Sequence, residues 1–250
     1  MLFFAVIMLA TSSTTAFAKE ITDGFYDVEV ISENSLSPQS EQIVVKNKMW
    51  FNGLRTTYSG YESHYTTNLA LEGSSMGYIY GQGKCPGFYI GNSRMSSVGC
   101  EIAAVYNAIK LRGLSISCSS IIRAFEKSGY LMTAGYLGSD PYAIGEYFSE
   151  NTAYSLTEYT DYSSMNNLVS NNISSFNVYI VSFWNSSSLT DGLHTVCFYT
   201  QDGGNTLNVY NFSNNSTGVV SRSSFSSYVD SDRFIVGYYV PRMGRMLSAD

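Results

Sequence analysis

The sequence has 250 residues, with 14 Lys and Arg against 20 Asp and Glu, so its formal net charge at pH 7 is −6. Hydrophobic residues make up 44% of the chain and there are only 4 prolines, which supports a folded core and excludes a disordered or collagen-like chain. The isoelectric point near 4.9 and the lack of a Lys/Arg cluster exclude nucleic acid as an expected partner, because phosphate binding needs an electropositive face. The length fits one domain with a small N-terminal appendage.

The first residues of the chain are similar to a secretory signal peptide. Leu2–Ala10 is an apolar run too short to span a bilayer, and the small residues after it end in Ala16-Phe17-Ala18, an A-x-A-like cleavage sequence. No Lys or Arg precedes the run, which leaves a short buried strand as the alternative. We expect residues 1–18 to be a signal peptide and the mature protein to be secreted, without a stable membrane anchor.

Residues 19–83 form a lead-in whose fold the sequence does not define clearly. Tyr26–Val30 and Ile43–Val45 alternate in a way that favours strands, so a propeptide and a small strand-rich lead-in both fit. The glycine-punctuated stretch Gly77–Asn92 then leads into residues 84–250, which we expect to form the main domain.

Helices are predicted in the next part of the chain. Apolar residues recur at helical spacing, and capping or stop residues mark the ends, which predicts a first helix of about 14 residues. The helices are expected from Ser97 to Arg112, from Ser119 or Ser120 to Gly129, from Asp140-Pro141 through Tyr147, and around Ser163–Val169.

The pattern changes to strands in the second half of the chain. Runs rich in β-branched and aromatic residues are bounded by turn residues, and Gln201–Asn205 joins two of these runs as a hairpin. The expected strands are Asn177–Trp184, Leu193–Thr200, Thr206–Phe212 and Arg233–Val240. Helices followed by an antiparallel sheet predict an α+β fold.

Cys100 is the first candidate for chemistry. It lies near the start of the first predicted helix, at about its third position if Ser97 is the cap, where unpaired N–H groups and the helix dipole stabilise a thiolate. The preceding Gly99 leaves space for a substrate backbone to approach. Taken alone, this position favours a structural cysteine, because buried free cysteines are common.

The chain has only two histidines, His64 and His194, so an imidazole base must be one of them. His194 opens a predicted strand and Asn211 ends the partner strand. If residues 203–204 form the turn, Asn211 lies diagonal to His194 on the same face, within reach of a side-chain hydrogen bond. One more loop residue would place them on opposite faces. Such a bond would orient the imidazole while its other nitrogen takes the proton of Cys100.

Two stretches resemble papain-like cysteine peptidases. Ser97–Ile109 is similar to their nucleophile helix, above all in the branch of bacteriocin-processing, double-glycine-type peptidases. His194–Tyr199 and Val209–Phe212 resemble that group's catalytic His strand and the strand with its Asp or Asn. The resemblance covers residues 87–241 and implies a papain-like fold, with a helical part that bears the nucleophile helix packed on a C-terminal antiparallel sheet. It implies Cys100 as nucleophile, His194 as general base and acid, and Asn211 as the orienting residue.

One position departs from this family. These peptidases usually place an oxyanion-stabilising glutamine six residues before the cysteine, where this chain has Arg94. Asn92 or Gln82 is the alternative side-chain donor. Without one, only the Cys100 backbone N–H would act, and losing one such donor costs about a hundredfold or more in rate.

The other possible ligands and nucleophiles lack a supporting context. His64 lies in the lead-in, where we expect a surface or propeptide residue. No CxxC or HExxH motif occurs, so we expect no metal and no organic cofactor. A disulfide between Cys85 and Cys118 is conceivable, and Cys197 is expected to pack in the core.

We therefore expect a secreted papain-like thiol hydrolase, most simply a cysteine peptidase that cleaves a peptide or protein substrate. The same triad acting on cell-wall peptides or as an acyl transferase is one alternative, because a fold does not determine the acyl acceptor. A secreted wall-binding or glycan-binding protein with an inactive triad is another, and the 21 tyrosines suit such a surface.

Overall fold

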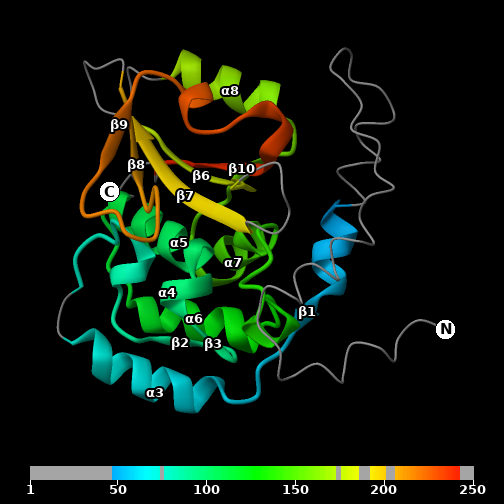
Figure 1. The fold of residues 1–250 in the computed structure, drawn as a ribbon, viewed down its shortest axis with the longest axis vertical. Coiled ribbons are helices and arrows are strands. Elements are labelled where there is room, and N and C mark those ends of the chain that lie inside the picture. Colours follow the sequence, from blue (N-terminus) through cyan, green and yellow to red (C-terminus); the bar gives the residue numbers. More distant parts are fainter. Residues whose placement is uncertain (1–46, 74–75, 173–175, 186–191, 201–205, 243–250) are drawn as a thin grey trace, which may run out of the picture.

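The computed structural model of the protein describes residues 47–73, 76–172, 176–185, 192–200 and 206–242. The predicted signal peptide, the predicted strands of the lead-in and the tip of the predicted hairpin lie outside these residues. Figure 1 shows a layered α+β arrangement, with a central sheet between helices.

The main sheet has six strands in the order β5-β10-β6-β7-β8-β9, and each neighbouring pair is antiparallel. Its strands are β5 (Thr157–Tyr159), β6 (Val178–Trp184), β7 (Leu193–Thr200), β8 (Leu207–Tyr210), β9 (Val220–Arg222) and β10 (Phe234–Val240). The four predicted strands are confirmed as β6, β7, β8 and β10. Successive side chains of these strands enter two separate apolar cores, one on each face of the sheet.

Helices lie on both faces of this sheet, α5, α6 and α7 on one and α8 on the other (Figure 1). The helices are α3 (Tyr61–Glu72), α4 (Met95–Val98), α5 (Cys100–Leu111), α6 (Cys118–Lys127), α7 (Ala143–Asn151) and α8 (Tyr162–Asn171). The short 3-10 helices are η1 (Gln82–Lys84), η2 (Thr133–Gly135), η4 (Phe225–Ser227) and η5 (Ser231–Arg233). Two small antiparallel sheets pair β1 (Arg55–Thr56) with β4 (Leu131–Met132) and β2 (Tyr89–Ile90) with β3 (Ser93–Arg94).

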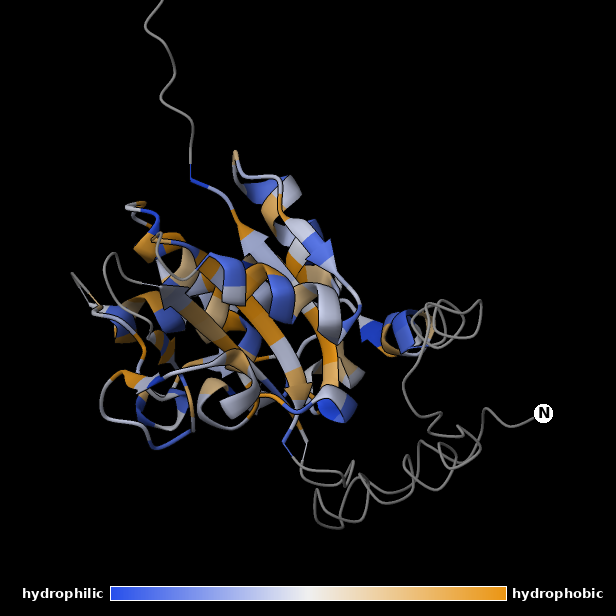
Figure 2. Ribbon diagram, turned by 90° about the horizontal axis from the view of Figure 1, so that it is seen from above, coloured by the Kyte–Doolittle hydropathy of each residue, from blue (hydrophilic) through white to orange (hydrophobic). Residues whose placement is uncertain are grey.

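The central helix of the larger core is α5. All of its residues from Cys100 to Ile109 are buried, and it packs on β6, β7 and α6. A helix that is buried around its whole circumference needs neighbours on every side. Figure 2 shows the hydrophobic residues concentrated on the elements in the middle of the molecule. This packing places the first turn of α5 against the first residues of β7, where Cys100 Sγ lies 3.8 Å from the Leu193 carbonyl oxygen.

Helix starts differ from the predicted ones by a few residues. Asp140 does not cap a helix that starts at Pro141, since α7 begins at Ala143 and Asp140 accepts from the Tyr142 N–H at 2.8 Å. Ser117 caps α6, not Ser119 or Ser120, because its side chain accepts a hydrogen bond from the Ser120 N–H at 3.0 Å. Asp161 caps α8 by accepting from the Ser164 N–H at 2.7 Å. The predicted helix around 163–169 is thereby confirmed and extended at both ends.

The described end of the lead-in packs on the main domain. Residues 47–53 are helical, and Phe51 lies in the larger core with 2% of its surface exposed. Arg55 donates through Nε to Asp140 at 2.6 Å and through its two other nitrogens to Glu146. Removal of the lead-in as a propeptide stays a prediction.

Candidate active site

The first predicted helix is interrupted at Gly99, which separates α4 from α5. Cys100 is therefore the first residue of α5 and not about its third. A Cβ on Gly99 would lie 2.3 Å from Cγ and 2.7 Å from the carbonyl oxygen of Met95. The absence of a side chain at Gly99 thus makes room for the turn of α4. The sequence had instead suggested that it makes room for a substrate backbone.

Cys100 is buried, with 5% of its surface exposed. Its Sγ lies 3.4 Å from Glu101 Oε1 and 3.8 Å from the carbonyl oxygen of Leu193, the residue before His194. Burial, together with the Glu101 carboxylate, raises the pKa of the Cys100 thiol well above its usual value. These effects outweigh the expected stabilisation by the helix N-terminus, so the resting group is a neutral thiol.

His194 is held by a main-chain carbonyl group. Its Nε2 donates to the Asn211 carbonyl oxygen at 2.7 Å, and the ring is 4% exposed. Burial lowers the pKa of His194, which the carbonyl groups of Asn211 and Phe212 partly oppose. A neutral ring that donates through Nε2 has Nδ1 as its acceptor nitrogen. The imidazole is therefore in the tautomer that can take a proton at Nδ1.

The structure does not bring His194 into direct contact with Cys100. Thr195 donates to Glu101 and so faces α5, and side chains alternate along β7, which directs His194 to the opposite face. There the ring packs edge-on against Phe183, with ring centroids 5.8 Å apart. The hydrogen bonds among the described residues include none between Cys100 and His194.

Asn211 links the ends of two segments that are distant in the sequence. Cys197 pairs with Tyr210, which is the register expected from a two-residue turn. Asn211 follows with a φ of 58°, so the strand ends there. Its carbonyl group meets His194, while its Oδ1 accepts from the Gln82 N–H at 2.8 Å and its Nδ2 donates to Gln82 Oε1 at 2.9 Å. The predicted side-chain bond to His194 is replaced by a main-chain bond, and the side chain positions η1 instead.

The structure distinguishes between the two amides considered as oxyanion donors. Gln82 is 2% exposed and is bound to Asn211, while its Nε2 donates to no residue in the described ranges. Asn92 is exposed at the turn between β2 and β3, where its backbone N–H donates to the Ala134 carbonyl oxygen at 2.8 Å. Only Gln82 therefore contacts another candidate residue.

The remaining cysteines and the second histidine lie elsewhere. Cys85 and Cys118 are both free thiols, so the conceivable disulfide is not formed, and Cys197 is fully buried as expected. His64 differs from the expected surface residue, because it is partly buried with Nδ1 2.7 Å from Glu126 Oε1. This histidine joins α3 to α6.

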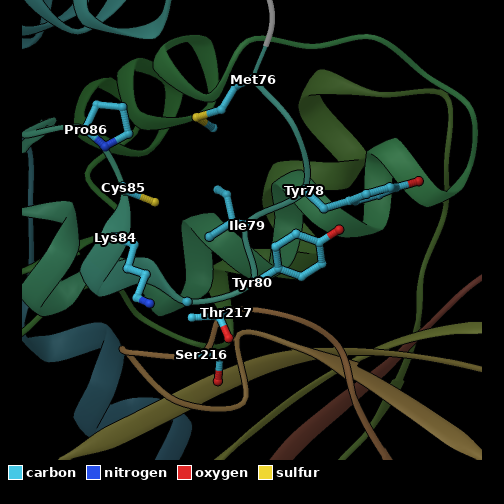
Figure 3. Close-up of a pocket in the computed structure, with 10 residues that line it drawn as sticks. Met76, Tyr78, Ile79, Tyr80, Lys84, Cys85, Pro86, Ser216 and Thr217 are labelled. Carbon is cyan, nitrogen blue, oxygen red and sulfur yellow. The ribbon is translucent and has the colours of Figure 1, made fainter.

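A pocket of about 290 Å³ lies beside η1 (Figure 3). Tyr78, Tyr80 and Cys85 belong to its lining, together with Ser216 from the segment after β8. The Tyr80 carbonyl oxygen accepts the Asn211 N–H at 3.0 Å, so this wall adjoins the Asn211 and Gln82 pair. Cys100 does not line the pocket.

The described residues contain neither a metal-binding cluster nor a membrane-spanning helix. No group of three or more His, Cys, Asp or Glu side chains there could hold a metal ion. None of the helices in those ranges has the length and apolar character needed to cross a membrane.

Comparison with known proteins identifies no family for this chain. No family model and no curated protein sequence matches. Among solved structures, the crystal structure of the Pseudomonas avirulence protein AvrPphB is similar at 10% sequence identity, over 76% of this chain and 98% of that one, with a TM-score of 0.23. A likeness at this TM-score supports no inference about function.

Proposed function

We propose that this protein is a secreted papain-like thiol hydrolase that acts as a cysteine peptidase on peptide or protein substrates. The observation that supports the proposal is that Cys100 and the hydrogen-bonded group of His194, Asn211 and Gln82 lie at the same end of β7, on its two faces. Cys100 begins the central helix against the start of β7, and His194, Asn211 and Gln82 are joined there by hydrogen bonds. A thiol at a helix start beside a strand that bears a histidine supports a thiol peptidase, whose base must come within hydrogen-bond reach of the thiol in the reacting complex.

In this mechanism the Cys100 sulfur attacks the substrate carbonyl carbon, and the thiol proton passes to His194 Nδ1. His194 then protonates the leaving amine, and water hydrolyses the thioester and restores the thiol. The backbone N–H of Cys100 and the Nε2 amide of Gln82 would stabilise the oxyanion. His194 and Cys100 lie on opposite faces of β7, so this transfer requires the first residues of β7 to rearrange until the imidazole reaches the thiol.

Labelling and cleavage of the reduced protein test this proposal. An epoxysuccinyl probe should modify Cys100, and a peptide library should be cleaved, with both results lost in Cys100→Ala and reduced in His194→Ala. Cys85→Ala is the matched control, because this half-buried thiol lies outside the proposed site and its loss should change neither result. Wild-type protein that is neither labelled at Cys100 nor active on the library would contradict the proposal.

A secreted binding protein with an inactive triad is the second candidate. The missing hydrogen bond between Cys100 and His194 and the raised thiol pKa of Cys100 favour it. Binding to purified cell-wall material or glycans that survives in Cys100→Ala, without cleavage by the wild type, would identify this function.

A further inference from the structure

A buried carboxyl group adjoins Cys100 and takes no part in the mechanism above. Glu101 is 1% exposed, although carboxylates are rarely buried without an ion pair. Its Oε1 accepts from Thr195 Oγ1 at 3.1 Å and from Cys100 Sγ at 3.4 Å. Its Oε2 is buried and has no hydrogen-bond partner in the described part of the chain. Burial raises the pKa of Glu101 to about 7, so its charge changes near neutral pH.

No cation in the described ranges pairs with this carboxylate. From β7 it meets Thr195, whose hydroxyl is also bonded to Ser182 of β6 at 2.9 Å. His194, the imidazole of β7, projects from the other face of that strand. Neither hydroxyl titrates near neutral pH, so the two strands leave the charge of Glu101 uncompensated.

The segment before α7 offers main-chain groups and no cation. Burial raises the pKa of Glu101 more than the Ser139 backbone N–H lowers it. Gly138 packs close to Glu101 Oε2, and the Ser139 hydroxyl beside it is buried without a partner in the described residues. Asp140, the acidic residue of this segment, is ion-paired with Arg55. Cys100 is thus the titratable side chain in contact with Glu101. The interaction between these two groups determines the pH at which each of them loses its proton.

We propose that the Glu101 carboxylate suppresses ionisation of the Cys100 thiol, so that loss of its charge increases the reactivity of Cys100. Two negative charges at contact distance in a buried site repel each other strongly, so the group that ionises first raises the pKa of the other. The two groups therefore titrate as one coupled pair. This inference rests on the proposed role of Cys100 as nucleophile and adds a control of that nucleophile by its neighbour.

The rate of Cys100 alkylation by iodoacetamide tests the coupling without any substrate. Peptide mass spectrometry resolves the four thiols, and the rate is followed from about pH 6 to pH 10. Glu101→Gln keeps the size and one hydrogen-bond acceptor but removes the charge. It should lower the pH midpoint of Cys100 alkylation by about one unit and increase the rate at pH 8 roughly tenfold.

A matched control uses the same substitution at another buried carboxyl group. Glu126 of α6 is fully buried and bonded to His64 and to the Gly91 N–H, so Glu126→Gln should leave the Cys100 midpoint unchanged. Thr195→Val provides a second variant that keeps the carboxyl group. It removes one hydrogen bond that stabilises the carboxylate, so more Glu101 is neutral at about pH 7 to 8, and Cys100 alkylation there should be faster than in the wild type but slower than in Glu101→Gln.

An unchanged or higher midpoint in folded Glu101→Gln overturns the inference. Slower alkylation at every pH also overturns it, since Glu101 would then be a proton acceptor for the thiol. If Glu101→Gln does not fold, the alkylation rate of Thr195→Val at about pH 8 decides, and a rate equal to or below that of the wild type overturns the inference. If the midpoints shift as expected but the wild type cleaves no peptide, the coupling stands and the peptidase proposal fails.

Discussion

Replacing Asn211 by alanine tests the role of this residue in building the site. Its side chain is fully buried and satisfies two groups of Gln82, the N–H at 2.8 Å and Oε1 at 2.9 Å. A buried polar group left without its partner costs about 1–3 kcal/mol, so two of them cost roughly 2–6 kcal/mol. Alanine at the left-handed φ of 58° adds about 1 kcal/mol relative to asparagine. We expect the free energy of unfolding to fall by roughly 3–7 kcal/mol, a large part of the usual 5–15 kcal/mol.

Urea denaturation measures this loss of unfolding free energy, with the same m-value used for the wild type and the variants. Asn211→Gly is the control, because it loses the same hydrogen bonds without the backbone penalty and should be more stable than the alanine variant by about 1 kcal/mol. The bond to His194 comes from the main chain, so the imidazole nitrogen shifts in NMR should keep the Nε2–H tautomer in the glycine variant. A loss below about 1 kcal/mol in Asn211→Ala, or a changed tautomer in Asn211→Gly, would refute this reasoning.

Three further predictions follow from other parts of the structure. Arg55→Ala leaves the buried Asp140 carboxylate without its ion pair and should cost about 3–5 kcal/mol, seen as a lower Tm; an unchanged Tm would contradict this. Gly99→Ala places a Cβ 2.7 Å from the Met95 carbonyl oxygen and should lower the free energy of unfolding by about 1–3 kcal/mol in urea denaturation. A urea midpoint equal to that of the wild type would contradict this prediction. Burial holds the pKa of His194 below its value in the unfolded chain, so the unfolded chain binds more protons and stability is lost as the pH falls through about 6.5. Folded His194→Asn should therefore lose less stability than the wild type between about pH 7 and pH 5, and equal slopes would count against this assignment.

The sequence predicted the strands well because their local pattern and their tertiary role agree. The predicted run Leu193–Thr200 is β7 residue for residue, since turn residues bound it on both sides and β-branched and aromatic residues fill it. The register with β8 followed from the loop length alone. The helix expected around Ser163–Val169 is also present, but its cap at Asp161 was not part of the prediction.

The details of the candidate site could not be predicted in the same way. Both faces of β7 are covered, so its sequence lacks the alternation that would have shown His194 pointing away from α5. The left-handed conformation of Asn211 depends on distant contacts with Gln82 and Tyr80. Glu101 gave no signal either, because a charged residue in the first turn of a helix is ordinarily exposed, and it is the approach of β7 and of the segment at Gly138 that buries it.

The bond between Gln82 and Asn211 joins residues 129 positions apart, which has a consequence for how the protein folds. A chain emerges from the ribosome with its N-terminal part first, and contacts of such long separation form only after both partners are available. The segment with η1, α4 and α5 is therefore synthesised long before the turn after β8. A nascent chain that ends before β7 carries the Cys100 thiol without the Leu193 neighbour that covers it. The bond between Gln82 and Asn211 forms later still, so burial of the thiol precedes completion of the group that holds His194.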